Sequence, residues 1–204
     1  MNREGWFEGR KRGRKVHLDE KPRVPPGQHR IDQLPVLHVG EVPSFDPGKW
    51  ELRIEGEVRE PRRLTYEEVH ALPSVIVTAD FHCVESWSRM DCAWEGVRFS
   101  DISELVAATE RARFVTIGCD GGYMTSLPLA ELLEPDVLLA WGLDGEPLRP
   151  EHGFPIRLVV PQRYAYKSAK WVRSIRFTYE QELGYWEARG YSNSADPWRE
   201  ERYE

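Results

Sequence analysis

Cysteine is scarce in this chain: its 204 residues include only Cys83, Cys92 and Cys119, and no two of them form a C-x-x-C pair. An odd number of cysteines without that spacing argues against a disulfide scaffold, a zinc ribbon and a c-type haem attachment site. Three thiols outside disulfides are typical of a reducing compartment. We therefore expect a cytoplasmic protein.

Long apolar runs are also missing. No stretch approaches the roughly 18 apolar residues that a membrane span needs, and no apolar region follows the N-terminal arginines as it does in a secretory signal. A Ser/Gly-rich linker is absent as well, and the composition of 40% hydrophobic and 30% charged residues suits one globular domain with a sizeable core. We expect a single domain over residues 24–204 and no membrane span.

Positive charge is concentrated at the N-terminus. Residues 1–15 hold six Arg or Lys and two Glu, so they carry a net charge of +4. The rest of the chain carries −10, which gives the whole chain its formal net charge of −6. Such a segment can contact nucleic acid or anionic lipid. The simpler interpretation is a solvated, flexible tail over residues 1–23, because no basic face continues beyond it. We expect no nucleic-acid partner.

The remaining pattern predicts several strands and a few short helices. Alternating polarity over residues 49–58 indicates a half-buried strand, and Thr65 with Glu68 forms a capping box that opens a short helix. Residues 74–84 read as a buried strand, residues 99–108 as a helix capped by Ser100, and "DGG" at 120–122 as the turn of a hairpin. Together these elements predict a mixed α+β domain built on β-sheets.

Groups that bind metals, anions and protons gather where the strand over residues 74–84 ends. Cys83 lies there, and Arg89 and Trp94 follow within a dozen residues. A lone buried cysteine is most often a small core residue, but an arginine and tryptophans nearby also suit a stabilised thiolate. Because side chains alternate along a strand, His82 and Cys83 point to opposite faces, which argues against one metal bound by both.

A second cluster lies in residues 151–171. Gly153 permits close backbone approach to a ligand, and Arg157 has the fork geometry that holds a phosphate bidentately. Ser168, Ala169 and Lys170 can present a hydroxyl, backbone N–H groups and an ammonium to the same anion. The alternative is a rim of surface cations paired with nearby carboxylates.

Several ordered motifs resemble the sulfite-oxidase-like family of molybdenum-cofactor oxidoreductases, from about residue 24 onward. "PGKWELRIEGEV" resembles the Trp-x-Leu-x-x-x-Gly strand of the family, "FHCVESWS" its metal-ligating cysteine segment and "WEGV" its Trp-x-Gly-Val turn. "HGFPIRLVVP" with "KSAKWVRSI" resembles its pterin-binding signature. "PPGQ", "LPVLH", "GYWEARGYSN" and "DPW" are similar to a small bacterial subgroup consisting of this domain alone.

The resemblance implies the sulfite-oxidase-like fold, a molybdenum–molybdopterin cofactor and roles for particular residues. Cys83 would be the protein ligand to molybdenum, since a soft thiolate suits this metal, and Arg89 and Trp94 would form part of the catalytic cleft wall. His38, His82 and Arg163 are further candidates for pocket residues, with structural roles equally open. The remaining cofactor contacts that it implies are Asp32, Pro35, Val36, Cys119, Asp120, His152, Arg157, Ser168, Ala169 and Lys170.

The function that follows is two-electron oxygen-atom transfer on a small substrate such as an oxyanion, S-oxide or N-oxide. The chain has no haem motif, so we expect a separate redox partner or electron carrier. One alternative is a non-enzymatic module that binds or delivers the cofactor. Another is a cysteine-dependent hydrolase, which would need the imidazole of His82 or His152 within about 3 Å of the Cys83 sulfur.

Overall fold

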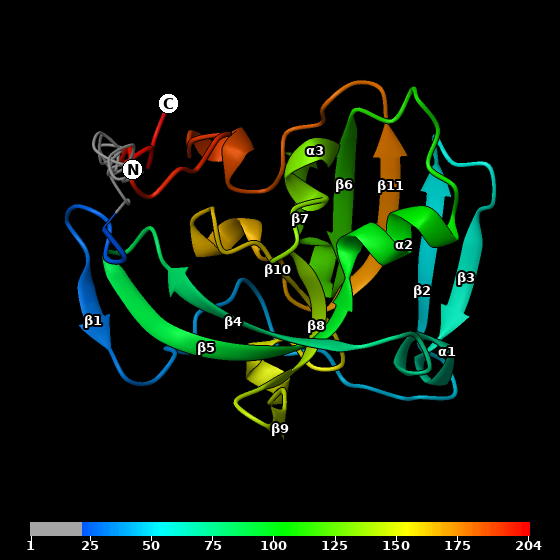
Figure 1. Ribbon diagram of the computed structural model, residues 1–204, viewed down its shortest axis with the longest axis horizontal. Helices are drawn as coiled ribbons and strands as arrows, with labels where there is room; N and C mark the ends of the chain where they lie inside the picture. Colours follow the sequence, from blue (N-terminus) through cyan, green and yellow to red (C-terminus); the bar gives the residue numbers. More distant parts are fainter. Residues whose placement is uncertain (1–21) are drawn as a thin grey trace, which may run out of the picture.

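Two β-sheets make up most of the chain in the computed structural model, which describes residues 22–204 (Figure 1). The expected basic tail falls almost wholly outside the described residues. The first sheet has the order β1-β5-β8-β10, with β4 also paired to β5 and β9 to β8. Its strands are β1 (His29–Ile31), β4 (Val75–His82), β5 (Trp87–Arg98), β8 (Leu138–Leu143), β9 (Glu146–Pro147) and β10 (Arg157–Val159).

The second sheet has the order β3-β2-β11-β6-β7, in which only β2 and β11 run parallel. Figure 1 shows its strands standing upright above the long, curved β5. The strands are β2 (Glu51–Gly56), β3 (Arg62–Thr65), β6 (Phe114–Cys119), β7 (Met124–Pro128) and β11 (Val172–Thr178). The α-helices are short: α1 (Tyr66–His70), α2 (Phe99–Leu105) and α3 (Leu129–Leu132). This architecture confirms the predicted mixed α+β fold built on sheets.

The main hydrophobic core lies between the two sheets and α2. Leu52 and Ile54 of β2 are buried there with Phe99 and Ile102 of α2 and Ile175 of β11. Each such side chain contributes roughly 1.5–3 kcal/mol by leaving water. A smaller cluster around Phe81, Trp87, Trp94 and Leu138 lies on the first sheet, and it supports the end of β4.

Of the two predicted helix caps, the structure confirms one and contradicts the other. The Thr65–Glu68 capping box is present at α1 in both of its hydrogen bonds. The expected Ser100 cap is wrong: the N-cap of α2 is Arg98, and Ser100 Oγ donates to Asp101 Oδ1 instead.

The strand predicted over residues 74–84 is shorter than expected, and it is buried only at its end. Among the strands of residues 22–204, β4 pairs only with β5 and therefore lies at a sheet edge, so Ile76 is 69% exposed while Phe81 is 3% exposed. Burial of this strand is thus confined to the part that leads into Cys83.

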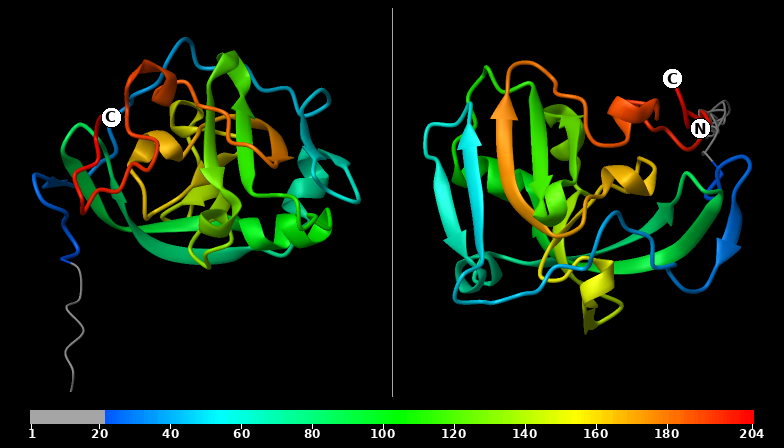
Figure 2. Two further views of the ribbon diagram at one scale, coloured as in Figure 1. Left: turned by 90° about the horizontal axis from the view of Figure 1, so that it is seen from above. Right: turned by 180° about the vertical axis from the view of Figure 1, so that it is seen from behind.

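The beginning and the end of the described chain lie side by side, as the blue and red segments in both views of Figure 2 show. Trp198 Nε1 donates a 2.8 Å hydrogen bond to the carbonyl of Pro22. In the part of the chain that the structure describes, no helix has the length and apolar character to cross a membrane.

Candidate active site

Cys83 occupies the tight turn between β4 and β5. Its N–H donates to the Trp87 carbonyl at 2.8 Å, and the N–H of Ser86, which has a φ of +72°, donates to the Cys83 carbonyl at 3.1 Å. The cysteine is 7% exposed, and burial raises the pKa of its thiol to about 11. The turn therefore fixes the sulfur in place, and a positive charge or a metal is needed to hold it as a thiolate.

Segments from both ends of the chain hold this turn. Gln28 Nε2 donates to the Cys83 carbonyl at 3.1 Å, and the His29 N–H donates to the Ser86 carbonyl at 2.9 Å. From the other end of the chain, the Arg202 guanidinium donates to the Val84 carbonyl. The position of Cys83 thus depends on contacts far apart in sequence.

A cavity of about 270 Å³ opens beside Cys83. One wall is the irregular segment after β1, and another is the β4–β5 turn. The rest comes from residues around β10 and the start of β11, from Tyr123 after β6, and from the segment that follows β11. The structure brings seven of the predicted site residues to this cavity: Pro35, Cys83, His152, Arg157, Ser168, Ala169 and Lys170.

One end of the cavity carries positive charge without a counter-ion. Arg157 is 3% exposed and donates to the carbonyls of His152 and Ser168 at 3.0 and 2.9 Å, while Lys170 Nζ donates to the carbonyls of Leu37 and Glu151 at 2.7 Å each. Within residues 22–204, no carboxylate forms a salt bridge with either cation. Burying unpaired charge is costly, so this end favours an anionic ligand.

The pKa values at this end reflect the same crowding of cations. Burial, followed by the nearby Arg157 charge, lowers the pKa of Lys170 to about 7, and burial lowers the pKa of Arg157 to about 10. Burial and these two cations also lower the pKa of His152. Gly153 has a φ of +114°, and a Cβ there would lie 3.0 Å from Arg157 Cβ, so the close packing of this end requires glycine.

Aromatic side chains that the sequence did not predict line the other part of the cavity. Tyr166, Trp186 and Tyr191 form a wall, with the Tyr191 ring centroid 5.6 Å from that of Tyr166 and 4.9 Å from that of Trp186. The only sequence signal for them is the run of aromatics in "YAYKSAK" and "GYWEARGY". Glu85 also lines the cavity, and we refer to Tyr166, Trp186 and Tyr191 below as the aromatic wall.

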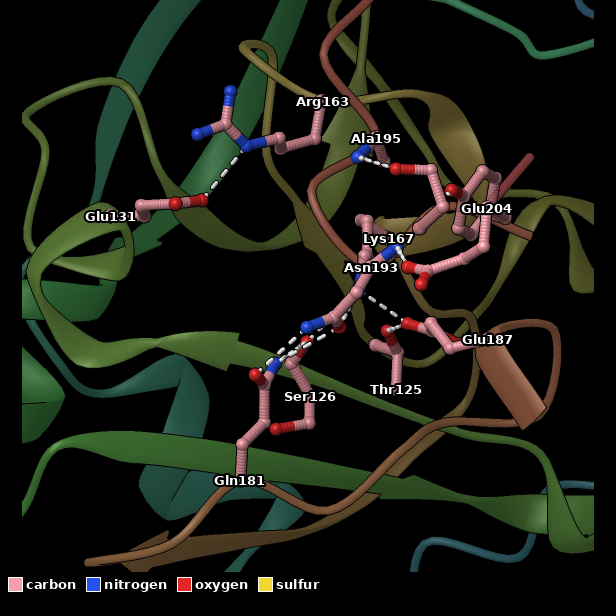
Figure 3. Close-up of polar contacts among 12 residues, drawn as sticks. Thr125, Ser126, Glu131, Arg163, Lys167, Gln181, Glu187, Asn193, Ala195 and Glu204 are labelled. Atoms are coloured by element: carbon pink, nitrogen blue, oxygen red, sulfur yellow. Dashed lines mark hydrogen bonds and ion pairs between the residues drawn. The ribbon is translucent and has the colours of Figure 1, made fainter. Parts of the chain in front are cut away.

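A buried polar network fixes the aromatic wall (Figure 3). The Lys167 ammonium, at the end of η3 (Ala165–Lys167), contacts the Glu187 carboxylate at the start of η4 (Glu187–Arg189). Thr125 Oγ1 donates to the same carboxylate at 2.8 Å, and Lys167 Nζ also donates to the Ser126 carbonyl at 3.1 Å. Figure 3 shows these groups converging between β7 and the C-terminal segment.

Four predicted cofactor contacts lie elsewhere. Asp32 and Val36 do not line the cavity: the Asp32 carbonyl accepts a hydrogen bond from Arg89, and Val36 is 52% exposed. Cys119 and Asp120 line a separate, shallow pocket beside Arg53 and Arg173, which shares Tyr123 with the cavity.

The placement expected for Arg89 and Trp94 in the cleft wall is wrong in this structure. Arg89 pairs with Asp144, at the turn after β8, and does not line the cavity. Trp94 is fully buried in the smaller core cluster, where the Arg157 guanidinium lies 5.3 Å from its ring centroid. An irregularity in the β4–β5 pairing between Ala79 and Phe81 changes which side chains share a face.

Of the three further candidates for pocket residues, one lines the cavity and two do not. His38 lines the cavity, with its ring 5.5 Å from Trp171, whereas Arg163 pairs with Glu131 away from the cavity. His82 is buried with Nδ1 2.8 Å from Ser88 Oγ, and burial lowers its pKa to about 4. Among the described residues, no histidine is hydrogen-bonded to the Cys83 sulfur, so the hydrolase hypothesis gains no support from this geometry.

Comparison with known proteins points to one family. The family model described as the oxidoreductase molybdopterin binding domain matches residues 39–186. The protein named Uncharacterized oxidoreductase YuiH, from Bacillus subtilis (strain 168), is 45% identical over 192 residues, which cover 94% of this chain and 97% of that protein.

Two further relatives are longer than this chain. The protein-methionine-sulfoxide reductase catalytic subunit MsrP from Campylobacter jejuni is 33% identical, with 71% of this chain and 54% of that protein covered. The crystal structure of the sulfane dehydrogenase SoxCD from Paracoccus pantotrophus superposes with a TM-score of 0.62 at 25% identity, over 68% of this chain and 40% of that one. This chain thus spans nearly all of YuiH but only about half or less of these two.

Proposed function

The chain belongs to the family of oxidoreductase molybdopterin-binding domains, and from this premise we propose that Cys83 is the protein ligand to molybdenum and that Arg157, Lys170 and His152 bind the phosphate end of the cofactor. The fold is the sulfite-oxidase-like molybdopterin fold. The observation that carries the proposal is one cavity that holds both a fixed cysteine sulfur and a pair of cations, the buried Arg157 and the half-buried Lys170. Among the described residues, neither cation has a carboxylate partner.

The residues present fit this cofactor. A thiolate is a soft ligand of the kind that suits molybdenum beside the two sulfurs of a pterin. The unbalanced charge of Arg157 and Lys170 suits a phosphate, and Ser168 and Ala169 line the same end. Because Gly153 has no side chain, the backbone just after η2 (Pro150–His152) packs closely against Arg157 and Lys170.

When bound, the cofactor supplies two-electron oxygen-atom transfer, and the chain supplies ligation, orientation and electrostatics. The turn that holds Cys83 orients the ligand through Gln28 and Trp87. The aromatic wall lines the neighbouring space with ring faces. Small substrates therefore meet a shaped, largely aromatic surface next to Cys83.

The substrates that we propose are small oxyanions, S-oxides or N-oxides. The methionine-sulfoxide reductase relative supports the S-oxides, although this chain covers 54% of its length. Electrons would reach or leave the site through a separate redox partner or carrier. Three thiols outside disulfides support a cytoplasmic location.

Protein purified from a molybdate-supplied host tests this proposal. We expect molybdenum and pterin in equal amounts, an electron paramagnetic resonance signal on partial reduction, and turnover of at least one oxide or oxyanion with an artificial electron carrier. Bound pterin without a redox-active metal would instead indicate a cofactor-delivery module. Protein with neither pterin nor metal, from a host that loads other molybdoenzymes, would contradict the proposal.

A further inference from the structure

Charge is distributed unevenly along the cavity. Among the described residues that line it, Glu85 is the sole carboxylate. Arg157 is the lining arginine and Lys170 is the lining lysine. Glu85 lies two residues after Cys83 and is exposed. The two cations donate to carbonyls of His152, Ser168, Leu37 and Glu151, and they form the end that we assign to the cofactor phosphate.

The electrostatic neighbours confirm that Glu85 belongs to the Cys83 end. Burial has the largest effect on the pKa of the Cys83 thiol; a hydrogen bond from the Glu85 backbone lowers this pKa, and the Glu85 charge raises it. The Glu85 charge also raises the pKa of Tyr191, after the larger effects of burial and Tyr203. Lys170 is influenced by Arg157 and Glu151 instead. The negative charge therefore lies beside Cys83 and the aromatic wall.

Two other arginines near this end are not lining residues of the cavity, and the charge of one of them, Arg202, lowers the pKa of the Cys83 thiol. Arg89 pairs with Asp144, and Arg202 donates to the Val84 carbonyl with its guanidinium 5.2 Å from the Tyr164 ring centroid. Neither arginine lines the cavity. An oxyanion placed beside Cys83 would therefore meet the Glu85 carboxylate and aromatic faces, without a lining guanidinium or ammonium to bind it.

We infer that the Cys83 end of the cavity is a subsite for substrates whose organic part carries a positive charge, with Glu85 and the aromatic wall as its specificity-determining residues. This inference rests on the proposed function and narrows its substrate class to cationic S-oxides or N-oxides. A carboxylate beside tyrosine and tryptophan faces is the combination that binds alkylammonium groups, through ion pairing and cation–π attraction. The buried Lys167–Glu187 pair keeps Trp186 in place, so the wall is formed before a ligand arrives.

Two matched sulfoxides test the inference: one bears a trimethylammonium group and the other a carboxylate at the same position. With molybdenum-loaded protein we expect kcat/KM to favour the cationic member about tenfold. The preference should nearly vanish in Glu85→Gln and reverse in Glu85→Lys. Glu104→Lys is the matched control, because Glu104 is exposed on α2 and its substitution changes the net charge equally.

Binding provides a readout that does not depend on turnover. The two corresponding thioethers are titrated against each variant, and tryptophan fluorescence is followed because Trp186 lines the cavity. The cationic thioether should bind the wild-type and Glu104→Lys proteins about tenfold more tightly than Glu85→Lys.

The outcomes separate the two proposals. Turnover of both sulfoxides without charge preference, or a preference unaltered in Glu85→Lys, overturns the subsite and leaves the proposed function standing. Charge-selective binding that Glu85→Lys removes, in protein that purifies from a molybdate-supplied host with neither pterin nor molybdenum, overturns the proposed function and supports the subsite. Equal binding of both thioethers in all variants overturns the subsite whether or not turnover occurs.

Discussion

The Lys167 ammonium contacts the Glu187 carboxylate where both side chains are only 1% exposed. The pair joins η3 to η4 across 20 residues of sequence, and Glu187 directly follows Trp186 of the aromatic wall in the chain. A charge pair this deeply buried is costly to break, because either partner alone would remain as an unpaired charge.

Lys167→Met should therefore lower the free energy of unfolding by about 3–5 kcal/mol. Urea denaturation followed by circular dichroism measures this loss. The double variant Lys167→Met/Glu187→Met removes both charges, so we expect it to recover most of the stability. A double variant as unstable as the single one would mean that packing around Lys167, rather than the stranded carboxylate, determines the effect.

Cys83→Ser should abolish molybdenum binding, while Cys92→Ala and Cys119→Ala should retain it. Cys83 is the cysteine that lines the cavity, whereas Cys92 is fully buried and Cys119 lies at the shallow pocket. Elemental analysis and electron paramagnetic resonance on the three variants provide the measurement. The assignment is wrong if Cys83→Ser keeps the wild-type spectrum and either other variant loses it.

Anion binding at the cationic end should weaken as pH rises through about 7. The pKa of Lys170 is lowered to about 7, and lysine carries its charge below its pKa, so affinity is highest at the acid side of that value. Sulfate is a suitable probe for cofactor-free protein, because it does not titrate in this range. Calorimetry between pH 6.5 and 8.5 should show a fall of about tenfold.

Lys170→Met should bind sulfate weakly and with little pH dependence over the same range. Lys49→Met is the control, since the Lys49 side chain is 85% exposed at the surface. Retention of the full pH dependence in Lys170→Met would assign the titration to another group.

His82 should make the protein sensitive to acid. Burial lowers its pKa to about 4, below the roughly 6.5 of an unfolded chain, so the unfolded state binds the proton more readily. The stability contributed by the neutral ring is complete above pH 6.5 and is lost as pH falls toward 4, by up to about 3 kcal/mol. His82→Gln should unfold with a flatter pH profile in this window. An identical acid dependence in both proteins would contradict this prediction.

The cationic end of the cavity could be predicted from sequence, because its residues come from two short segments on either side of β10. His152 and Arg157 lie five positions apart, and Ser168 to Lys170 follow within one connection. Their chemistry and spacing left two interpretations open, an anion site and a rim of paired surface cations, and the structure places these residues together at one cavity.

The Cys83 end could be predicted only in part. The aromatic wall combines Tyr166 with Trp186 and Tyr191, which only tertiary packing brings together. The cleft-wall placement of Arg89 and Trp94 came from the resemblance and from their nearness to Cys83 in sequence, which does not determine which way a side chain points along an irregular hairpin. In this hairpin the pairing shifts between Ala79 and Phe81, and Asp91 has a φ of +54°. The pattern of residue types along the sequence does not predict such an irregularity in strand pairing.

The contacts that Gln28 and Arg202 make with the Cys83 turn have a consequence for biosynthesis. Gln28 and Arg202 bind neighbouring carbonyls of that turn, so its geometry is complete only after the ribosome has made the chain through Arg202. A nascent chain that ends earlier has the cysteine and the cations but lacks the last contact that fixes the sulfur. On the proposed role of Cys83, we expect chains that end before Arg202 to retain the cofactor less well than chains that contain it.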